Sequence, residues 1–426
     1  MNKWIVKYKQ SDVKHEIKDV FYLIALQGVN YIAPLLVLPY LMVVLGAEKF
    51  GYIGFSLSVT QYLMLIVDFG FNLSATKRIA LNKNNIEELN NIFTSTLYAK
   101  LVLLVISFII LIGFASVPRF DVYRETMFVL FLMVVGNTFS FVWLFQGLGK
   151  IKIISIVNII SKLMILPITF LLVKEPNDYL IAAFIQAFVG IFSMFISIGY
   201  MFQNKMVEIS SFVKKNIVYE LRESFPLFLS SAATSLYMAS FVIVLGYFST
   251  AQEVGQYSAA DRITRALCWL IVIPISQAFY PKITRMGLEN KQKAMKLILK
   301  ILFFIIGSMV VIFIILFFFS TSLVLFLGKD YSSAINLFKI MSFIPFFSGI
   351  SMIVAQLGIL ALGNEKDKKN YQKACFIGGG AALICLIFVI PNYQAEGASV
   401  SLLLTELVIC LMMLWYGRNF LKLRKL

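Results

Sequence analysis

Residues 20–74 read VFYLIALQGVNYIAPLLVLPYLMVVLGAEKFGYIGFSLSVTQYLMLIVDFGFNLS, and this stretch decides the fold. It contains two apolar runs, 20–45 and 51–74, with the short connection Ala47–Phe50 between them. Each run has the ~20 residues or more that an α-helix needs to cross about 30 Å of hydrocarbon. The connection is too short to form a domain. The stretch therefore predicts two membrane-spanning helices joined by a tight turn.

The same alternation of apolar runs and short polar connections continues along all 426 residues. Hydrophobic residues make up 60% of the chain, charged residues 14%, and the mean hydropathy is +0.85, which excludes a soluble globular domain. No cleavage site follows the first run, so we expect an uncleaved N-terminal tail rather than a signal peptide. We predict an all-α polytopic membrane protein with about 12 transmembrane helices, at 20–45, 51–74, 96–117, 125–147, 151–173, 179–202, 222–248, 254–283, 297–320, 332–363, 372–390 and 396–417.

The distribution of Lys and Arg predicts the orientation. Of the 38 such residues, 29 fall on connections of one side and only 5 on the other. Short loops rich in Lys and Arg stay in the cytoplasm, so we place the N- and C-termini there. The net charge of +16 is spread over these loops, with no basic groove or nucleic-acid-binding motif. We therefore expect membrane lipids as partners and no nucleic acid.

The longest cytoplasmic connection, 203–221, divides the predicted helices into six and six. It mixes apolar residues with Lys and Glu, which is typical of an amphipathic helix at the membrane surface. Each half has an even number of helices, so both would have the same orientation, as in a parallel repeat. The predicted parts are an N-terminal tail (1–19), an N-lobe (20–202), an amphipathic inter-lobe linker (203–221), a C-lobe (222–417) and a C-terminal tail (418–426).

A weak internal repeat supports the two halves. Residues 45–52 (LGAEKFGY) and 245–257 (LGYFSTAQEVGQY) both begin with Leu-Gly and continue to an acidic residue, a glycine and a tyrosine. Prolines within or at the ends of the spans would bend their helices, which is common in any helix bundle and also suits a protein that must close at either end. These prolines are Pro34, Pro39, Pro167, Pro226, Pro274, Pro281 and Pro345.

Sequence patterns of enzymes are missing. There is no nucleophile elbow, no phosphate-binding loop and no metal-spaced cluster of His and Cys. His15, in the polar N-terminal tail, is the single histidine. The cysteines lie in apolar runs without C-x-x-C spacing, so we interpret them as small core residues. We expect a protein that is not an enzyme and needs no cofactor or metal. The cysteines are Cys268, Cys375, Cys385 and Cys410.

Four basic residues fall inside apolar runs, where an ionised side chain costs at least ~2.5–3.5 kcal/mol unless it is paired or faces water. Lys162 lies near the middle of its span, on the helical face that also carries Asn158, so this face is predicted to line a cavity. A structural ion pair is the alternative. Lys339 lies near a span end, where its side chain can reach the membrane surface.

Arg262 and Arg265 are one turn apart, with Asp261 at the i−4 position of Arg265. They predict a cationic cavity that would attract a phosphate or diphosphate, although a pair at the membrane surface would explain them as well. Asp68 and Glu406 are the other acidic residues in spans. Together with Asp261 they are candidates for coupling or gating. Asp68 could equally be a structural anchor, and Glu406 could be a counter-ion, a protonated structural group or a proton-coupling site.

Several motifs resemble those of a known family. The chain is similar to the Wzx-type O-antigen flippases, the polysaccharide transport family of the multidrug/oligosaccharidyl-lipid/polysaccharide (MOP) exporter superfamily. The resemblance covers most of the chain and is densest in its first third. The motifs are 27–31 (QGVNY), 34–41 (PLLVLPYL), 45–51 (LGAEKFG), 68–75 (DFGFNLSA), 143–147 (WLFQG), 255–260 (GQYSAA) and 279–281 (FYP).

The resemblance implies two six-helix lobes around a central cavity in the bacterial inner membrane. It also implies translocation of undecaprenyl-diphosphate-linked oligosaccharide, such as an O-antigen repeat unit of lipopolysaccharide, from the inner to the outer leaflet. Lys162, Arg262 and Arg265 are the plausible cationic cavity residues. Asn158 and Asn30, which lies in the first motif, are further substrate-binding candidates. Polysaccharide polymerase and chain-length regulator proteins are expected partners.

Our hypothesis is therefore a flippase that works by alternating access. A cation-coupled multidrug exporter of the same fold is one alternative, although its first span would then be expected to carry Asp or Glu, and 20–45 has neither. A polytopic glycan polymerase or ligase is another, although such an enzyme needs a substantial outer loop. A purely structural partner in glycan assembly is the third.

Overall fold

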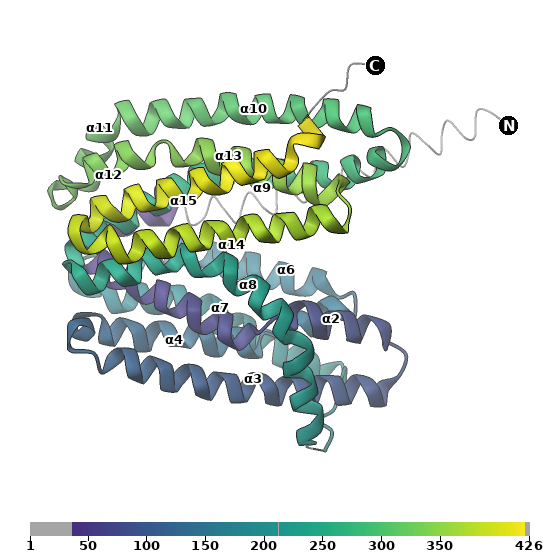
Figure 1. Cartoon of the computed structure of the whole chain (residues 1–426). Helices are drawn as coiled ribbons and strands as arrows, with labels where there is room; N and C mark the ends of the chain where they lie inside the picture. The colour runs from purple at the N-terminus through teal and green to yellow at the C-terminus, as the bar shows by residue number, and fades with distance from the viewer. Residues whose placement is uncertain (1–35, 212, 422–426) are drawn as a thin grey trace.

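The structure is a computed structural model that describes residues 36–211 and 213–421, and within these ranges it consists of helices and turns without a strand (Figure 1). Ten helical stretches of the described chain are long and apolar enough to cross a membrane. The elements are a helix at 36–68, α2 (Phe71–Leu81), α3 (Ile86–Ala115), η1 (Pro118–Tyr123), α4 (Arg124–Phe139), α5 (Val142–Gly147), α6 (Ile151–Leu172), η2 (Pro176–Asp178), α7 (Tyr179–Gln203), α8 (Lys214–Phe248), α9 (Ala251–Glu289), α10 (Lys291–Phe318), α11 (Ser320–Leu327), η3 (Lys329–Tyr331), α12 (Ala334–Met341), α13 (Ile344–Ile353), the π-helix η4 (Val354–Leu360), α14 (Glu365–Phe388) and α15 (Ile390–Leu421).

The all-helical membrane fold is confirmed, whereas the ten candidate stretches of the described residues leave the number of twelve spans a prediction. One of the ten stretches, 36–81, contains both the end of the first predicted span and the second span. The seventh predicted span falls in α8, of which Ala239–Phe248 is a shorter apolar segment. Most of the first predicted span, including Asn30, and the N-terminal tail lie outside the described residues.

Left-handed residues mark the turns of the first stretch. Gly46, inside the helix at 36–68, has a left-handed φ of 69° and lies one residue after the predicted end of the first span. Phe69 (φ 42°) and Gly70 (φ 85°) then separate this helix from α2. The second predicted span, 51–74, therefore runs across a break, because apolar residues continue on both sides of it.

Prolines lie inside three of the long helices, where each removes a backbone hydrogen bond. Pro167 lies within α6, Pro226 within α8, and both Pro274 and Pro281 within α9. The tenth predicted span, 332–363, is divided into α12, α13 and η4.

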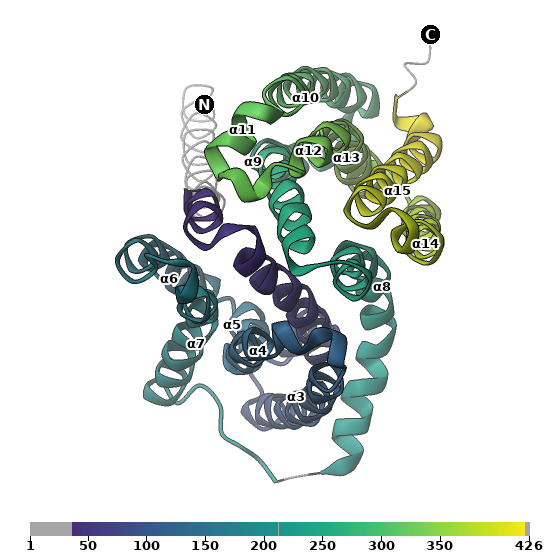
Figure 2. The ribbon, with the colours of Figure 1, turned by 90° about the vertical axis from the view of Figure 1, so that its left-hand side faces the viewer.

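The helices pack in two groups, which Figure 2 shows on either side of a seam. In the N-terminal group, between residues 36 and 203, α4 and α6 pack on α7, and α2 packs on α5. In the C-terminal group, α9 to α15, α9 packs on α10, while α13 and α14 pack on α15. Helix α8 contacts α2 and α3 of the first group and α14 and α15 of the second, so it lies between them.

The predicted amphipathic linker helix at 203–221 is not a separate helix. After α7 ends at Gln203, the chain has no regular structure up to residue 211, and α8 begins at Lys214. The irregular part is attached to α3, since the Glu208 N–H donates to Asn90 Oδ1 at 2.8 Å and the Ser210 N–H donates to Thr94 Oγ1 at 2.9 Å. Three charged residues of the expected linker, Lys214, Lys215 and Glu220, therefore lie in the first turns of a long α8, whereas Lys205 and Glu208 lie in the irregular part.

Candidate functional site

The two copies of the sequence repeat contact each other at the seam. A Cβ atom built on Gly51 would lie 2.0 Å from the Ala251 carbonyl oxygen, and one built on Gly255 would lie 1.7 Å from the Ala47 carbonyl oxygen. Real Cβ atoms stay beyond about 3.0 Å, so only glycine fits at either position. Gly51 packs on Ala251, which is four residues before Gly255, and Gly255 packs on Ala47, which is four residues before Gly51. The contact of Ala47, Gly51, Ala251 and Gly255, called the glycine contact below, is thus reciprocal, as expected between copies of a repeat.

Close packing continues along the seam from the glycine contact. A Cβ atom on Gly54 would lie 2.9 Å from Ser258 Cβ, and one on Gly246 would lie 2.4 Å from the Phe55 ring. The first described helix therefore packs on the start of α9 and on the end of α8, which joins the two groups at this end.

Polar contacts across the seam flank the glycine contact. From η1 of the N-terminal group, the Arg119 Nε donates to the Tyr247 carbonyl at 2.8 Å, and its guanidinium also donates to the Ser249 carbonyl at 3.3 Å. From η3 of the C-terminal group, the Tyr331 hydroxyl donates to the Met42 carbonyl at 3.3 Å. Thus η1 of the N-terminal group binds the backbone at the end of α8, and η3 of the C-terminal group binds the backbone of the first described helix. These contacts hold this end, which the charge distribution predicts to be the outer one, closed.

Arg265 lies in a cluster of charged and polar groups inside the C-terminal group. Its Nε donates to Asp261 Oδ1 at 2.6 Å, and another guanidinium nitrogen lies 3.9 Å from Glu406 Oε1 on α15. The other Glu406 oxygen accepts from the Ser348 hydroxyl of α13 at 2.9 Å. Of the interpretations left open for Glu406, this geometry fits the counter-ion. One guanidinium between two carboxylates leaves little positive potential for an anionic ligand.

Arg262, one turn before Arg265, is directed to the seam. Its guanidinium carbon lies 5.8 Å from the centre of the Phe50 ring of the N-terminal group, in a cation–π contact. Among the described residues no ion pair of Arg262 is found, so its charge is better placed than that of Arg265 to meet a ligand between the groups.

Lys162 and Asn158 lie on α6, and both side chains are half-buried. The described part of the chain contains no ion pair with Lys162. The alternative interpretation of Lys162, a structural ion pair, therefore has no support among the described residues. Asn30 cannot be compared, since it precedes the described residues.

Asp68 is held inside the N-terminal group. Its Oδ1 accepts from Lys100 Nζ of α3 at 3.2 Å and from Asn137 Nδ2 of α4 at 2.9 Å. Lys100 is only 2% exposed, so it is not the cytoplasmic loop lysine that the charge count assumed. The charge count placed Lys100 with the cytoplasmic connections although the predicted span 96–117 already contains it, and in the structure it lies well inside α3 (Ile86–Ala115). This geometry fits the anchor interpretation of Asp68.

A second charged cluster, not found from the sequence, fixes α8 to the N-terminal group. Arg78 at the end of α2 pairs with Glu220 of α8, lies 3.3 Å from Glu88 of α3, and packs against the Tyr219 ring. Burial raises the pKa of the Glu220 carboxyl, and the Arg78 guanidinium opposes that rise. In the sequence, the basic residues of the connections were used only to predict which side of the membrane each connection faces. The adjacent residues Tyr219 and Glu220 have no spacing that would indicate a cluster with Arg78.

The described residues contain no group of three or more His, Cys, Asp and Glu placed to hold a metal ion. Helices long enough to span a membrane, two groups that meet through an internal repeat and buried charged clusters define a multi-pass membrane protein with the architecture of a transporter.

The chain belongs to the family described as polysaccharide biosynthesis protein, which matches residues 17–287. It is 32% identical over 405 residues to the "Putative O-antigen transporter" of Escherichia coli (strain K12), covering 94% of this chain and 96% of that protein. The protein of the same name from Shigella dysenteriae is also 32% identical, over 404 residues that cover 93% and 98% of the two chains. The resemblance stated from the sequence motifs is thus confirmed.

Solved structures of the MOP superfamily share the fold. The lipid II flippase MurJ in an inward closed conformation matches with a TM-score of 0.71 at 17% identity, over 92% of this chain and 87% of that one. An inward-facing multidrug resistance MATE family transporter gives 0.68 at 15% identity, over 93% of each chain. An outward-facing MATE family transporter gives 0.58 at 16% identity, over 95% of this chain and 94% of that one. At these identities the likeness is one of fold.

Proposed function

We propose that this protein is a flippase that moves undecaprenyl-diphosphate-linked oligosaccharide from the inner to the outer leaflet of a bacterial inner membrane by alternating access. The observation that carries the proposal is the glycine contact, because two helix groups that meet reciprocally at one end can separate there as rigid bodies. The relatives named as O-antigen transporters support the class of substrate.

In this mechanism the two groups are the described parts of two six-helix lobes, with both termini in the cytoplasm. The head group enters between them from the inner side while the glycine contact is closed. Lys162 and Arg262 receive the diphosphate, since each cation within ~4 Å of a phosphate contributes about 4 kcal/mol at an effective dielectric constant of ~20. Arg265 shapes the wall through its fixed pairing with Asp261 and Glu406. Separation at the glycine contact then releases the glycan to the other side.

A cation-coupled multidrug exporter of the same fold is the second candidate, and the Asp261–Glu406 pair is the observation in its favour. A buried carboxylate (Glu406) and a partly buried one (Asp261) around one arginine could exchange protons or bind a cation during a transport cycle. In the flippase the same carboxylates, with Asp68, would serve coupling or gating. Polysaccharide polymerase and chain-length regulator proteins would be the partners of the flippase in the membrane.

Transport by purified protein in proteoliposomes tests the proposal. The substrate is a fluorescent polyprenyl-diphosphate oligosaccharide, and the measurement is the rate at which an impermeant glycan-binding lectin gains access to it. We expect Lys162→Ala and Arg262→Ala each to slow transfer roughly tenfold or more. Salt should inhibit transfer by the wild type more strongly than transfer by either variant. Lys339→Ala, which changes an exposed lysine of α12, is the matched control.

A lipophilic cation is tested in the same vesicles. Transport of the cation in place of the diphosphate lipid, unaffected by Lys162→Ala and Arg262→Ala, would overturn the flippase proposal and favour the exporter.

A further inference from the structure

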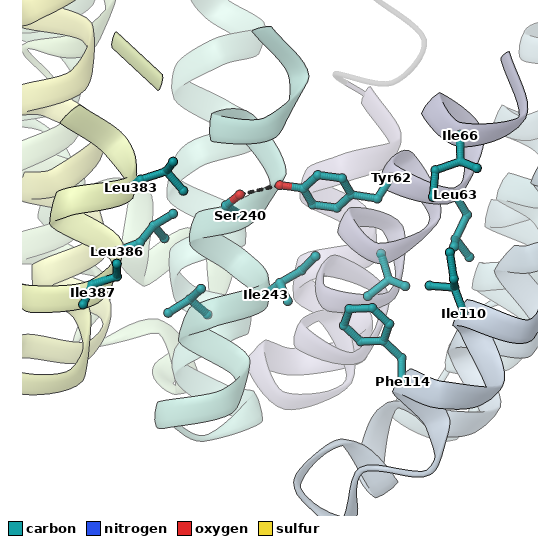
Figure 3. Close-up of a pocket in the computed structure, with 12 residues that line it drawn as sticks. Tyr62, Leu63, Ile66, Ile110, Phe114, Ser240, Ile243, Leu383, Leu386 and Ile387 are labelled. Atoms are coloured by element: carbon teal, nitrogen blue, oxygen red, sulfur yellow. Dashed lines mark hydrogen bonds between the residues drawn. The ribbon is translucent and has the colours of Figure 1, made fainter. Parts of the chain in front are cut away.

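A cavity of about 450 Å³ lies beside the seam, lined by side chains from four helices (Figure 3). The first described helix and α3 form one wall, α8 lies between, and α14 of the C-terminal group forms the other wall. Apart from Tyr62 and Ser240, every lining side chain is aliphatic or phenylalanine. The cavity is separate from the charged clusters described above and has no part in the proposed binding of the head group.

The polar groups of this cavity are already engaged with each other. Tyr62 and Ser240 form a hydrogen bond that joins the first described helix to α8, as the dashed line in Figure 3 shows. Among the residues that the structure describes, no charged side chain lines the walls. A polar or charged ligand would lose its hydration there without replacement, whereas a hydrocarbon would lose nothing. Water is a poor occupant for the same reason, since a buried water needs two to four polar partners.

The wall formed by α14 indicates where the occupant comes from. Leu383 is 54% exposed and Ile387 is 65% exposed, although both line the cavity. They belong to Glu365–Phe388, one of the stretches that can span a membrane. The cavity therefore opens on the lipid-facing surface, and a hydrocarbon chain can enter it from the side.

The position of the cavity connects it to movement of the two groups. Phe55, which packs on Gly246 of α8, lies two turns before Tyr62 on the same helix, so the cavity continues the close contact at the seam. Its walls belong to both groups and to α8, so separation of the groups changes its width. Because the head group is proposed to pass between these same groups, the tail attached to it is the hydrocarbon chain held nearest to this cavity during transport.

We propose that this cavity binds the isoprenoid tail of the lipid-linked substrate while the diphosphate and glycan move between the helix groups. The proposal rests on the proposed function and adds to it where the tail lies. The chain enters past Leu383 and Ile387 and lies against Ile243, and the Tyr62–Ser240 hydrogen bond limits how far it extends.

A photoreactive substrate tests this assignment. The purified full-length protein is irradiated with a polyprenyl diphosphate that has a diazirine in its tail and no glycan, and adducts are located by mass spectrometry. We expect adducts on 240–244 and 383–387, lost on competition with unlabelled polyprenyl diphosphate and retained with an equal amount of phosphatidylglycerol. Adducts spread evenly over the apolar surface, or equal competition by phosphatidylglycerol, would overturn the proposal.

A pair of substitutions on α14 provides the matched control. Ile387→Trp fills the mouth of the cavity from an exposed position, whereas Ile384→Trp changes a residue that is 61% exposed but does not line the cavity. We expect loss of the adducts and of transport in Ile387→Trp, and neither loss in Ile384→Trp. Adducts unchanged in Ile387→Trp would contradict the assignment.

The two proposals fail in distinguishable ways. Adducts at the cavity without transport of the diphosphate lipid would refute the flippase and leave the tail site. Transport by wild type and by Ile387→Trp, with adducts elsewhere, would refute the tail site and leave the flippase.

Discussion

The Arg265 side chain lies between two carboxylates, Asp261 on its own helix and Glu406 on α15, in a region where Glu406 is only 2% exposed. Such a group is costly to bury alone, since an ion loses its hydration and regains only what its partners provide. The three side chains therefore act as a unit, and the removal of one leaves the charges of the others uncompensated.

Arg265→Ala should accordingly lower the stability of the protein by about 3–5 kcal/mol, the usual cost of breaking a buried pair. The measurement is thermal or denaturant unfolding of the purified protein in detergent. Glu406→Gln should be less harmful, because the amide keeps the shape and can still accept from Ser348.

The double variant Arg265→Ala/Glu406→Gln should be more stable than the sum of the two single changes predicts, since one orphaned carboxylate is removed. Additive effects would show that Arg265 and Glu406 do not interact. Arg262→Ala is the control at the neighbouring position, and we expect it to change stability less than Arg265→Ala.

At the scale of elements, the sequence predicts helices well and their ends poorly. Apolar runs of about 20 residues predict where the membrane-spanning helices lie, because crossing hydrocarbon requires that length. The start of α8 and the start of α3 were missed for one reason. Both carry charged residues that a hydropathy pattern assigns to loops, whereas the structure stabilises them by the contacts of Arg78 with Glu220 and Glu88.

The charged site residues were found from the sequence, but their partners were not. A single Lys or Arg inside an apolar run is visible at once, because its cost in the membrane is large. The pairs Asp68–Lys100 and Arg265–Glu406 join residues far apart in the chain, so no spacing rule indicates them. The i−4 pair Asp261–Arg265 was predicted, since helical geometry alone places the two together.

The close approach of the first described helix to α9 gives the prediction at this scale. In Gly255→Ala the new Cβ would lie 1.7 Å from the Ala47 carbonyl oxygen, so the two helices must move apart. We expect the closed end to open more often. The measurement is the labelling rate of Ser258→Cys, in a protein otherwise without cysteine, by a water-soluble maleimide.

Gly307→Ala is the matched control, since nothing lies within 4 Å of a Cβ at this position of α10. It should leave the labelling rate unchanged and stabilise the helix by about 0.5–1 kcal/mol. If Gly255→Ala labels no faster than Gly307→Ala, the glycine contact does not determine access to this end.

At the scale of the whole molecule, the internal repeat has a physical role that two short sequence matches could not reveal. Gly51 and Gly255, one from each copy of the repeat, form the surface at which the two halves meet. A reciprocal contact of this kind has few interlocking side chains at its centre, so its two sides can part without unfolding either group. The polar contacts at its edge are two hydrogen bonds from Arg119 and one from Tyr331, all to carbonyls, and water can replace them.

A disulfide across this seam should therefore stop the transport cycle. A Cβ on Gly54 would lie 2.9 Å from Ser258 Cβ, and a disulfide needs roughly 3.5–4.5 Å, so a small shift suffices for Gly54→Cys/Ser258→Cys to cross-link. In a protein whose native cysteines are replaced, we expect the oxidised double variant to bind substrate but not move it, because the halves cannot separate. A reductant should restore transport, and each single variant should be unaffected by oxidant. Full transport by the cross-linked protein would mean that this end stays closed throughout the cycle, and the glycan would then have to leave by another route.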